Sequence, residues 1–117
     1  MESGVIELLL IDLILMLLPV VFYFFPPKKM NSLYGYRTLK SFKDQRSWDF
    51  AQRYSAKRLL QISFIIMLLQ ITMILLGVDA NIENSYLLLV TLLSYIIGLI
   101  ICVISTEIAL KKLQENA

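Results

Sequence analysis

The sequence predicts an all-α integral membrane protein: a three-helix bundle with a basic cytoplasmic loop and helix between its first and second spans. The chain of 117 residues is 58% hydrophobic with a mean hydropathy of +0.72, which is too apolar for an ordinary soluble domain. Three apolar runs, 4–25, 59–78 and 86–106, are each long enough for a helix that crosses about 30 Å of hydrocarbon. Nine of the eleven Lys and Arg residues lie between the first two runs, at 26–58. We therefore expect one membrane domain over 1–117.

The first run, 4–25, is interrupted only by Glu7, Asp12 and Pro19. A cleaved signal peptide is the alternative, but such peptides begin with basic residues and end in small ones. The sequence instead begins MESGVIE, which is acidic, and the run ends in the aromatic residues of FYFFPP. We therefore expect a retained helix that the two prolines terminate.

The segment between the first two runs is expected to form turns and then a helix. Ser41 followed by Asp44 fits a capping box, in which the Ser41 hydroxyl accepts from first-turn amides. A helix should then begin near Phe42 and run straight into the second span, although a bend near Ser55 is equally allowed. Its aromatic and basic residues suit an interfacial helix against anionic lipid, and a dedicated partner-binding face is the alternative.

Charge predicts the orientation of the spans. The segment 26–58 holds nine cations against two aspartates, whereas 79–85 holds Asp79 and Glu83 with no cation. The positive-inside rule therefore places 26–58 in the cytoplasm. The N-terminus then lies outside, and the C-terminal tail with Lys111 and Lys112 lies inside.

No set of residues typical of a catalytic site emerges from the sequence. The chain has no His and a single Cys, Cys102, which excludes His-based metal sites, Ser-His triads and an internal disulfide. It also lacks a glycine-rich phosphate loop and a paired Cys motif. We expect neither an enzyme, nor a cofactor, nor a metal site, nor direct binding of nucleic acid.

Small residues recur every four positions along the third run: Ser94, Gly98, Cys102 and Thr106. Such a stripe allows close helix packing, either within the bundle or in a homo-oligomer. At the inner end of this run, Glu107 could pair with Arg37 or Arg58.

The stretch NSLYGYRT, followed by Ser41, Trp48 and WDFAQRYSAK, resembles the cytoplasmic signature of the SdpI family of bacterial membrane proteins. Seven positions match the family pattern: Asn31, Gly35, Arg37, Thr38, Ser41, Trp48 and Ala51. Leu39, Gln52 and Ala56 stand where the family has Pro, Asn and Gly. The resemblance covers 26–58 in motif and extends more loosely to the three-span layout.

The resemblance implies a multi-pass immunity protein of the bacterial plasma membrane, in the family's short form. Such proteins protect the producing cell from a secreted peptide toxin, and some are thought to hold a transcriptional repressor at the membrane. The expected ligand- or partner-binding residues are Asn31, Gly35, Tyr36, Arg37, Thr38, Ser41, Trp48 and Gln52. The same residues could instead fold the loop against the bundle, with Gly35 supplying a positive φ or a close backbone approach.

Three polar residues in the spans form a second candidate site. Asp12, Gln70 and Ser94 should lie at a common depth, about 12 Å below the outer surface. A carboxylate at that depth usually faces the bundle interior. The cluster is either a hydrogen-bonded clamp, with Ser94 or Thr72 as a further member, or a polar pocket that a toxin segment or a proton enters.

A second function from another class stays open. A small proton-coupled transporter of cationic amphiphiles would use Asp12 as its exchange carboxylate. Transport predicts efflux that Asp12→Asn abolishes, whereas immunity predicts protection from a toxin without flux.

Overall fold

The chain folds into three long helices. The computed structural model describes residues 3–77 and 86–116, which form α1 (Ser3–Phe24), α2 (Gln45–Leu75) and α3 (Tyr86–Glu115) without a strand in these ranges. All three helices are long and apolar enough to cross a membrane. The predicted all-α membrane fold is confirmed.

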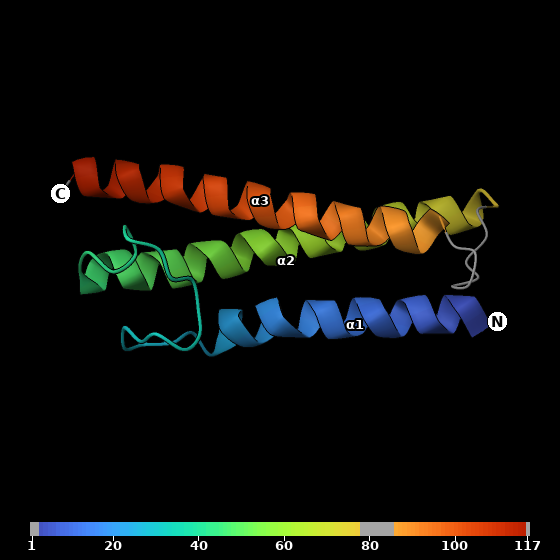
Figure 1. Cartoon of the computed structure of the whole chain (residues 1–117), viewed down its shortest axis with the longest axis horizontal. Coiled ribbons are helices and arrows are strands. Elements are labelled where there is room, and N and C mark those ends of the chain that lie inside the picture. The colour runs from blue at the N-terminus through green and yellow to red at the C-terminus, as the bar shows by residue number, and fades with distance from the viewer. Residues whose placement is uncertain (1–2, 78–85, 117) are drawn as a thin grey trace.

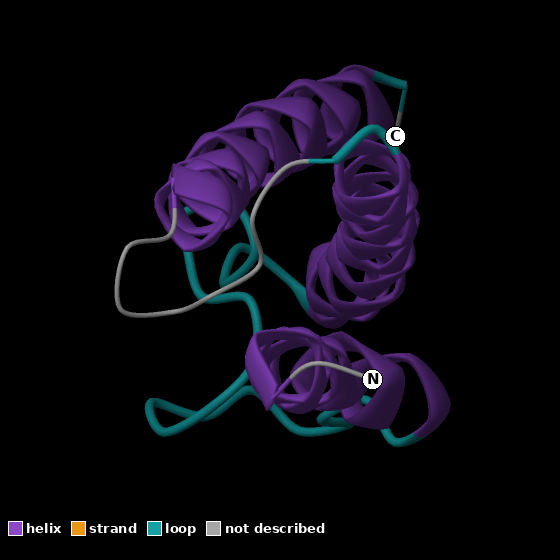
Figure 2. Cartoon of the chain, turned by 90° about the vertical axis from the view of Figure 1, so that its right-hand side faces the viewer, coloured by secondary structure: helices purple, strands orange, loops and turns teal. Residues whose placement is uncertain are grey.

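The helices lie side by side along an axis of 52 Å, with α2 packed against both α1 and α3 (Figures 1 and 2). The start of α1, the end of α2 and the start of α3 share one end of the molecule (Figure 1). The loop between α1 and α2 lies at the other end with the C-terminal part of α3. At 31 and 30 residues, α2 and α3 are each about 45 Å long and exceed a 30 Å hydrocarbon layer.

Helix α2 is continuous, so the straight alternative is the one observed. Its N-cap is Asp44, whose backbone is extended (φ −157°). The Asp44 carboxylate accepts a hydrogen bond from the Ser47 amide in the first turn, at 2.7 Å. The prediction that Ser41 caps the helix is wrong. The Ser41 hydroxyl instead accepts from the Thr38 amide and donates to the Thr38 carbonyl, both at 2.8 Å, because it closes a turn that precedes the helix.

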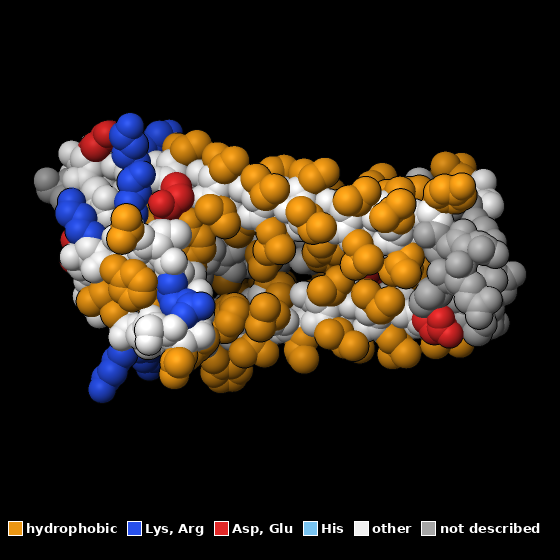
Figure 3. All heavy atoms as spheres, viewed as in Figure 1, with side chains coloured by type: hydrophobic (Ala, Val, Ile, Leu, Met, Phe, Trp, Pro, Cys, Tyr) orange, Lys and Arg blue, Asp and Glu red, His pale blue; other side chains and the backbone are white. Residues whose placement is uncertain are grey.

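Polar and small side chains fill the contacts between helices, while apolar ones cover the outside. Ser63, Gln70, Thr91 and Thr106 are buried, whereas most Leu and Ile side chains of the spans are exposed. On the face shown in Figure 3, hydrophobic side chains cover the middle and Lys and Arg gather at the loop end. This distribution suits a bundle whose outer surface meets lipid.

The small-residue stripe packs within the bundle. A Cβ on Gly98 would lie 2.5 Å from Cγ2 of Ile62, so α3 approaches α2 closely at this point. The buried Cys102 thiol donates to the Ser55 carbonyl at 3.4 Å. Gly98 and Cys102 thus pack within the bundle, and the use of the stripe in a homo-oligomer stays a prediction.

Candidate functional site

The cytoplasmic signature folds into a compact loop, residues 31–41, which we call the signature loop. The Asn31 carboxamide oxygen accepts from the amides of Leu33 and Tyr34, both at 2.9 Å. These bonds form an Asx-type turn, which explains an Asn at this position. The Tyr34 ring stacks on Phe22 of α1 with a centroid separation of 6.0 Å.

Gln52 of α2 binds both polar groups of the Tyr36 backbone. Its Oε1 accepts from the Tyr36 amide and its Nε2 donates to the Tyr36 carbonyl, both at 2.7 Å. This approach requires Gly35, whose φ is +100° and whose added Cβ would lie 2.6 Å from Gln52 Oε1 and 2.7 Å from Pro27 Cγ. Both effects expected of Gly35, a positive φ and a close approach, occur together.

Glu107 of α3 is the second attachment point of the signature loop. Its Oε2 accepts from the hydroxyls of Tyr36 and Thr38, each at 2.9 Å. Burial, and then the neighbouring carboxylate of Glu107, raise the pKa of the Tyr36 hydroxyl, which keeps it a donor. The expected pairing of Glu107 with Arg37 or Arg58 is therefore replaced by bonds to two hydroxyls that the loop brings to α3.

The remaining signature residues divide into buried and exposed ones. Trp48 is fully buried and donates from Nε1 to the Pro27 carbonyl at 2.7 Å, with the Phe42 ring 5.3 Å away. Among the eight signature residues, all of which the structure describes, Arg37 alone is exposed. Its guanidinium donates to the Ser32 carbonyl within the same loop. The signature thus ties the loop to α2 and α3 through its own side chains.

In the spans, the structure brings together two of the three polar residues expected. Asp12 and Gln70 are 3% and 2% exposed, and their side chains lie beside each other. The Gln70 amide donates to the Thr91 hydroxyl at 3.0 Å. Thr91 thus occupies the place expected for Ser94, and Thr72 bonds to the Leu68 carbonyl of its own helix at 2.8 Å.

Two further residues extend this cluster. The buried Tyr95 hydroxyl lies near Ser63 and within electrostatic range of Asp12. We call Asp12, Ser63, Gln70, Thr91 and Tyr95 the three-helix polar cluster, since α1, α2 and α3 all contribute to it. Polar residues within the apolar runs, such as Asp12, were the sequence signal for this cluster. The part played by Tyr95 could not be predicted, because it depends on the register of the helices and on the length of the tyrosine side chain.

Much of the hydrogen-bonding capacity of the three-helix polar cluster is unused. Within residues 3–77 and 86–116, five of its buried atoms have no hydrogen-bond partner: Asp12 Oδ1, Asp12 Oδ2, Ser63 Oγ, Gln70 Oε1 and Tyr95 Oη. Such groups are expensive in a membrane interior unless a proton, water or ligand satisfies them. The clamp and the polar pocket expected from the sequence both stay predictions.

Asp12 also lines an apolar pocket of about 400 Å³ on α1 and α2. The other lining residues are Ile6, Leu9, Leu10, Leu13, Met16 and Met67. Both carboxylate oxygens are buried in the bundle, so the surface of the pocket is apolar and the carboxylate lies behind it. This arrangement suits a ligand that is both hydrophobic and positively charged. In the described part of the chain, no three Cys, Asp or Glu side chains converge as a metal site requires.

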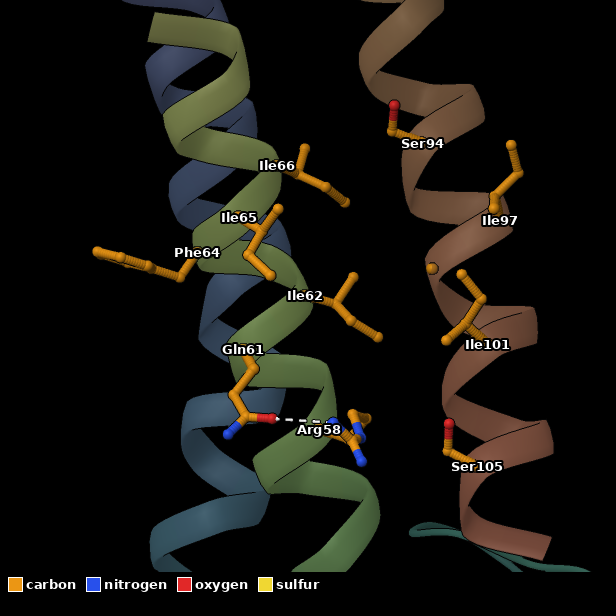
Figure 4. Close-up of a pocket in the computed structure, with 11 residues that line it drawn as sticks. Arg58, Gln61, Ile62, Phe64, Ile65, Ile66, Ser94, Ile97, Ile101 and Ser105 are labelled. Carbon is orange, nitrogen blue, oxygen red and sulfur yellow. Dashed lines mark hydrogen bonds between the residues drawn. The ribbon is translucent and has the colours of Figure 1, made fainter. Parts of the chain in front are cut away.

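Ser94 belongs to a different cavity. It lines a groove of about 760 Å³ between α2 and α3. Arg58 and Gln61 lie toward one end of this groove, and isoleucines of both helices line its middle (Figure 4). The Arg58 guanidinium is engaged there by the Tyr54 hydroxyl at 2.9 Å and by the Gln61 carboxamide at 3.5 Å. Its charge is therefore partly satisfied, unlike that of Asp12.

Comparison with known proteins places the sequence in a family. The model of the SdpI/YfhL protein family matches residues 28–106, which is more than half of the chain. A protein named YfhL from Bacillus subtilis (strain 168) is 52% identical over 42 residues, 36% of this chain and 38% of that relative. The match thus spans less than two thirds of the relative's own length. No solved structure matches the chain.

Proposed function

This chain belongs to the SdpI/YfhL protein family, and on that premise we propose that it protects the cell from a secreted peptide toxin by binding the toxin within the membrane. Family membership suggests a membrane protein of the immunity type. The finer proposal, capture of the toxin without a chemical reaction, rests on the surfaces that the chain offers to a ligand. The plasma membrane of the producing bacterium is where such a toxin acts.

The observation that carries the proposal is the unpartnered carboxylate of Asp12 inside the bundle. Polar groups of the signature loop are hydrogen-bonded to Gln52 and Glu107. These bonds attach the loop to the bundle, and the bonded groups are not free for a ligand. The Asp12 pocket retains both an uncompensated charge and an apolar wall. A membrane-active peptide with cationic and apolar side chains complements these two features.

A signalling role would use the opposite end of the protein. Leu39 is 94% exposed and Leu33 is 83% exposed, in a loop whose cations include Lys28, Lys29 and Arg37. Exposed leucines within a basic segment suit contact with anionic headgroups or with an acidic, apolar protein surface such as that of a captured repressor. Replacement of both leucines by serine would abolish such capture and leave toxin protection unchanged.

Proton-coupled transport of cationic amphiphiles is the second candidate function, favoured by the same Asp12 carboxylate. A transporter moves its ligand across the bilayer, whereas an immunity protein retains it. Proteoliposomes with an imposed proton gradient distinguish the two, because transport predicts gradient-dependent movement of an amphiphilic cation and immunity predicts binding with no flux.

The proposed function is tested by survival. Sensitive bacteria that produce the protein, and matched bacteria with an empty vector, are challenged with a panel of secreted membrane-active peptides. We expect producing cells to survive a peptide that kills the vector control, with equal growth in its absence. Equal killing of both strains by every peptide, at verified levels of membrane-inserted protein, would contradict the proposal.

A further inference from the structure

We propose that the Asp12 pocket is a binding site for hydrophobic cations, in which the Asp12 carboxylate receives the positive charge and the apolar wall receives the body of the ligand. The natural ligand of this site would be a cationic segment of the toxin, and that identity rests on the proposed function. The site itself can be tested with a simple cation.

The three-helix polar cluster offers the Asp12 carboxylate only neutral donors. The unused acceptors are the two oxygens of Asp12 and Oε1 of Gln70. The unused donors are the hydroxyls of Ser63 and Tyr95 and the second N–H of Gln70, whose first N–H bonds to Thr91. Even if all three donors turn toward Asp12, a positive charge or a proton is needed to neutralise the carboxylate.

The negative charge of Asp12 is not compensated within the described part of the protein. The protein offers Asp12 no cationic partner, because both carboxylate oxygens lack even a hydrogen bond among the described residues. An unpaired carboxylate within a bilayer is costly, and such groups mark sites for protons, ions or substrates. A cation that reaches the carboxylate therefore gains an interaction that the protein does not satisfy itself.

The size and apolar lining of the pocket favour one class of cation. The pocket is about 400 Å³ and its other six lining residues are Ile, Leu or Met, whereas one water occupies only about 30 Å³ of liquid. A bare metal ion would leave that apolar volume empty and would lack further oxygen ligands there. A cation with an apolar body fills the pocket and neutralises the carboxylate in the same event.

Proton competition follows from this arrangement. From α2 the carboxyl faces Gln70 and from α3 it faces Tyr95; Gln does not titrate, and a tyrosine hydroxyl is neutral at physiological pH. On α1, Glu7 is exposed. Asp12 is then the group whose protonation competes with the ligand, so binding should weaken as the pH falls.

The test uses tetraphenylphosphonium and, as a matched probe, tetraphenylborate, an anion of the same shape. The full chain is placed in nanodiscs of zwitterionic phosphatidylcholine, and bound probe is measured by equilibrium dialysis against empty nanodiscs. We expect saturable, one-to-one binding of the cation that weakens with falling pH, and no saturable binding of the anion.

Two variants and one control identify the site. Asp12→Asn should weaken cation binding by about tenfold or more, as loss of a buried charge partner does, while Glu7→Gln removes a charge from the same helix and should leave binding unchanged. Leu13→Trp keeps the carboxylate and should block the pocket. Circular dichroism confirms that each variant retains its helices.

Equal cation binding by Asp12→Asn and the wild type, or equal saturable uptake of the anion, would overturn the inference. Because this assay contains no toxin, its failure leaves the survival experiment untouched. Conversely, intact cation binding in a protein that protects against no peptide would contradict the proposed function and retain the site.

Discussion

At the scale of single residues, two buried carboxamides are used in opposite ways. Gln52 makes one bond through its oxygen and one through its nitrogen, both to the Tyr36 backbone. Gln70 uses its nitrogen on Thr91 and leaves its oxygen without a partner among the described residues. The first amide is a completed structural bond, and the second belongs to a cluster with capacity left for a ligand.

Replacement of Gly35 by alanine tests whether Gln52 and Gly35 act as one unit. The added Cβ would meet Gln52 Oε1 at 2.6 Å in a backbone with φ of +100°, so Gly35→Ala should cost roughly 2–4 kcal/mol from strain and overlap. Thermal unfolding in detergent, followed by circular dichroism, measures the loss.

Gly77→Ala is the matched control for this substitution. Gly77 also has a positive φ, +97°, but an added Cβ would meet nothing within 4 Å. It should lose only the backbone strain of about 1–2 kcal/mol. Equal losses in the two variants would show that the contact with Gln52 contributes nothing.

Residue identity predicts some of these features and not others. The positive φ at Gly35 follows from the residue type, which alone tolerates it without cost. The partners of Glu107 do not follow, because they depend on how far the signature loop reaches across α2 to α3. The same holds for Tyr95, whose long side chain brings its hydroxyl near Ser63 and within electrostatic range of Asp12.

At the scale of elements, the loop end of the molecule is held by the termini of two helices. Asp44 starts α2 and accepts from the Ser47 amide. Near the end of α3, the Gln114 carboxamide donates to the Lys40 carbonyl at 2.9 Å and to the Ser47 hydroxyl at 3.0 Å. The helix start, the signature loop and the last turns of α3 therefore stabilise one another.

The Asp44 cap should make this end sensitive to acid. Hydrogen bonds from Ser47 hold the pKa of the Asp44 carboxyl below its usual value. Its contribution is then present above the unfolded pKa of about 3.9 and is lost as the pH falls through the lower folded pKa. Asp44→Ala should lower the melting temperature at neutral pH and have little effect in strong acid.

Asp49→Ala is the control for the cap, because it removes the same charge from an exposed position one turn into α2. Among residues 3–77 and 86–116, Asp49 accepts a hydrogen bond from Gln45 alone, at 2.8 Å. If the melting temperature of Asp44→Ala fell by the same amount at every pH, the carboxylate bond to Ser47 would not be the cause.

The elements were the most predictable level of the structure. Three apolar runs predicted three helices because a chain in lipid must satisfy its backbone internally. The exact N-cap was missed, since Ser41 and Asp44 both suit a cap and only the path of the loop decides between them. The last nine residues of α3, beyond Thr106, pack beside the start of α2 through contacts such as Arg46 to the Leu113 carbonyl at 3.1 Å.

At the scale of the whole molecule, charge is concentrated at one end and an uncompensated carboxylate lies toward the other. The cations gather around the signature loop (Figure 3), whereas Asp12 lies in the half of α1 nearer its N-terminus. The positive-inside rule predicts that the loop end faces the cytoplasm. A toxin that arrives from outside would then meet the Asp12 end first.

Cysteine labelling tests this orientation. Leu39→Cys and Tyr86→Cys place thiols at positions that are 94% and 81% exposed, at opposite ends of the bundle, while the native Cys102 is buried. A membrane-impermeant maleimide should label Tyr86→Cys in intact cells and Leu39→Cys only after permeabilisation. The reverse labelling pattern would show that the protein has the opposite orientation in the membrane.

The most direct test of the account asks where in the molecule protection resides. Cells producing the wild type, Asp12→Asn, Glu7→Gln or Arg37→Ala, at equal levels in the membrane, are challenged with a peptide against which the wild type protects. The account predicts that Asp12→Asn loses protection, whereas Glu7→Gln and Arg37→Ala retain it. Protection that is lost with Arg37→Ala and kept with Asp12→Asn would contradict it and move the site to the signature loop.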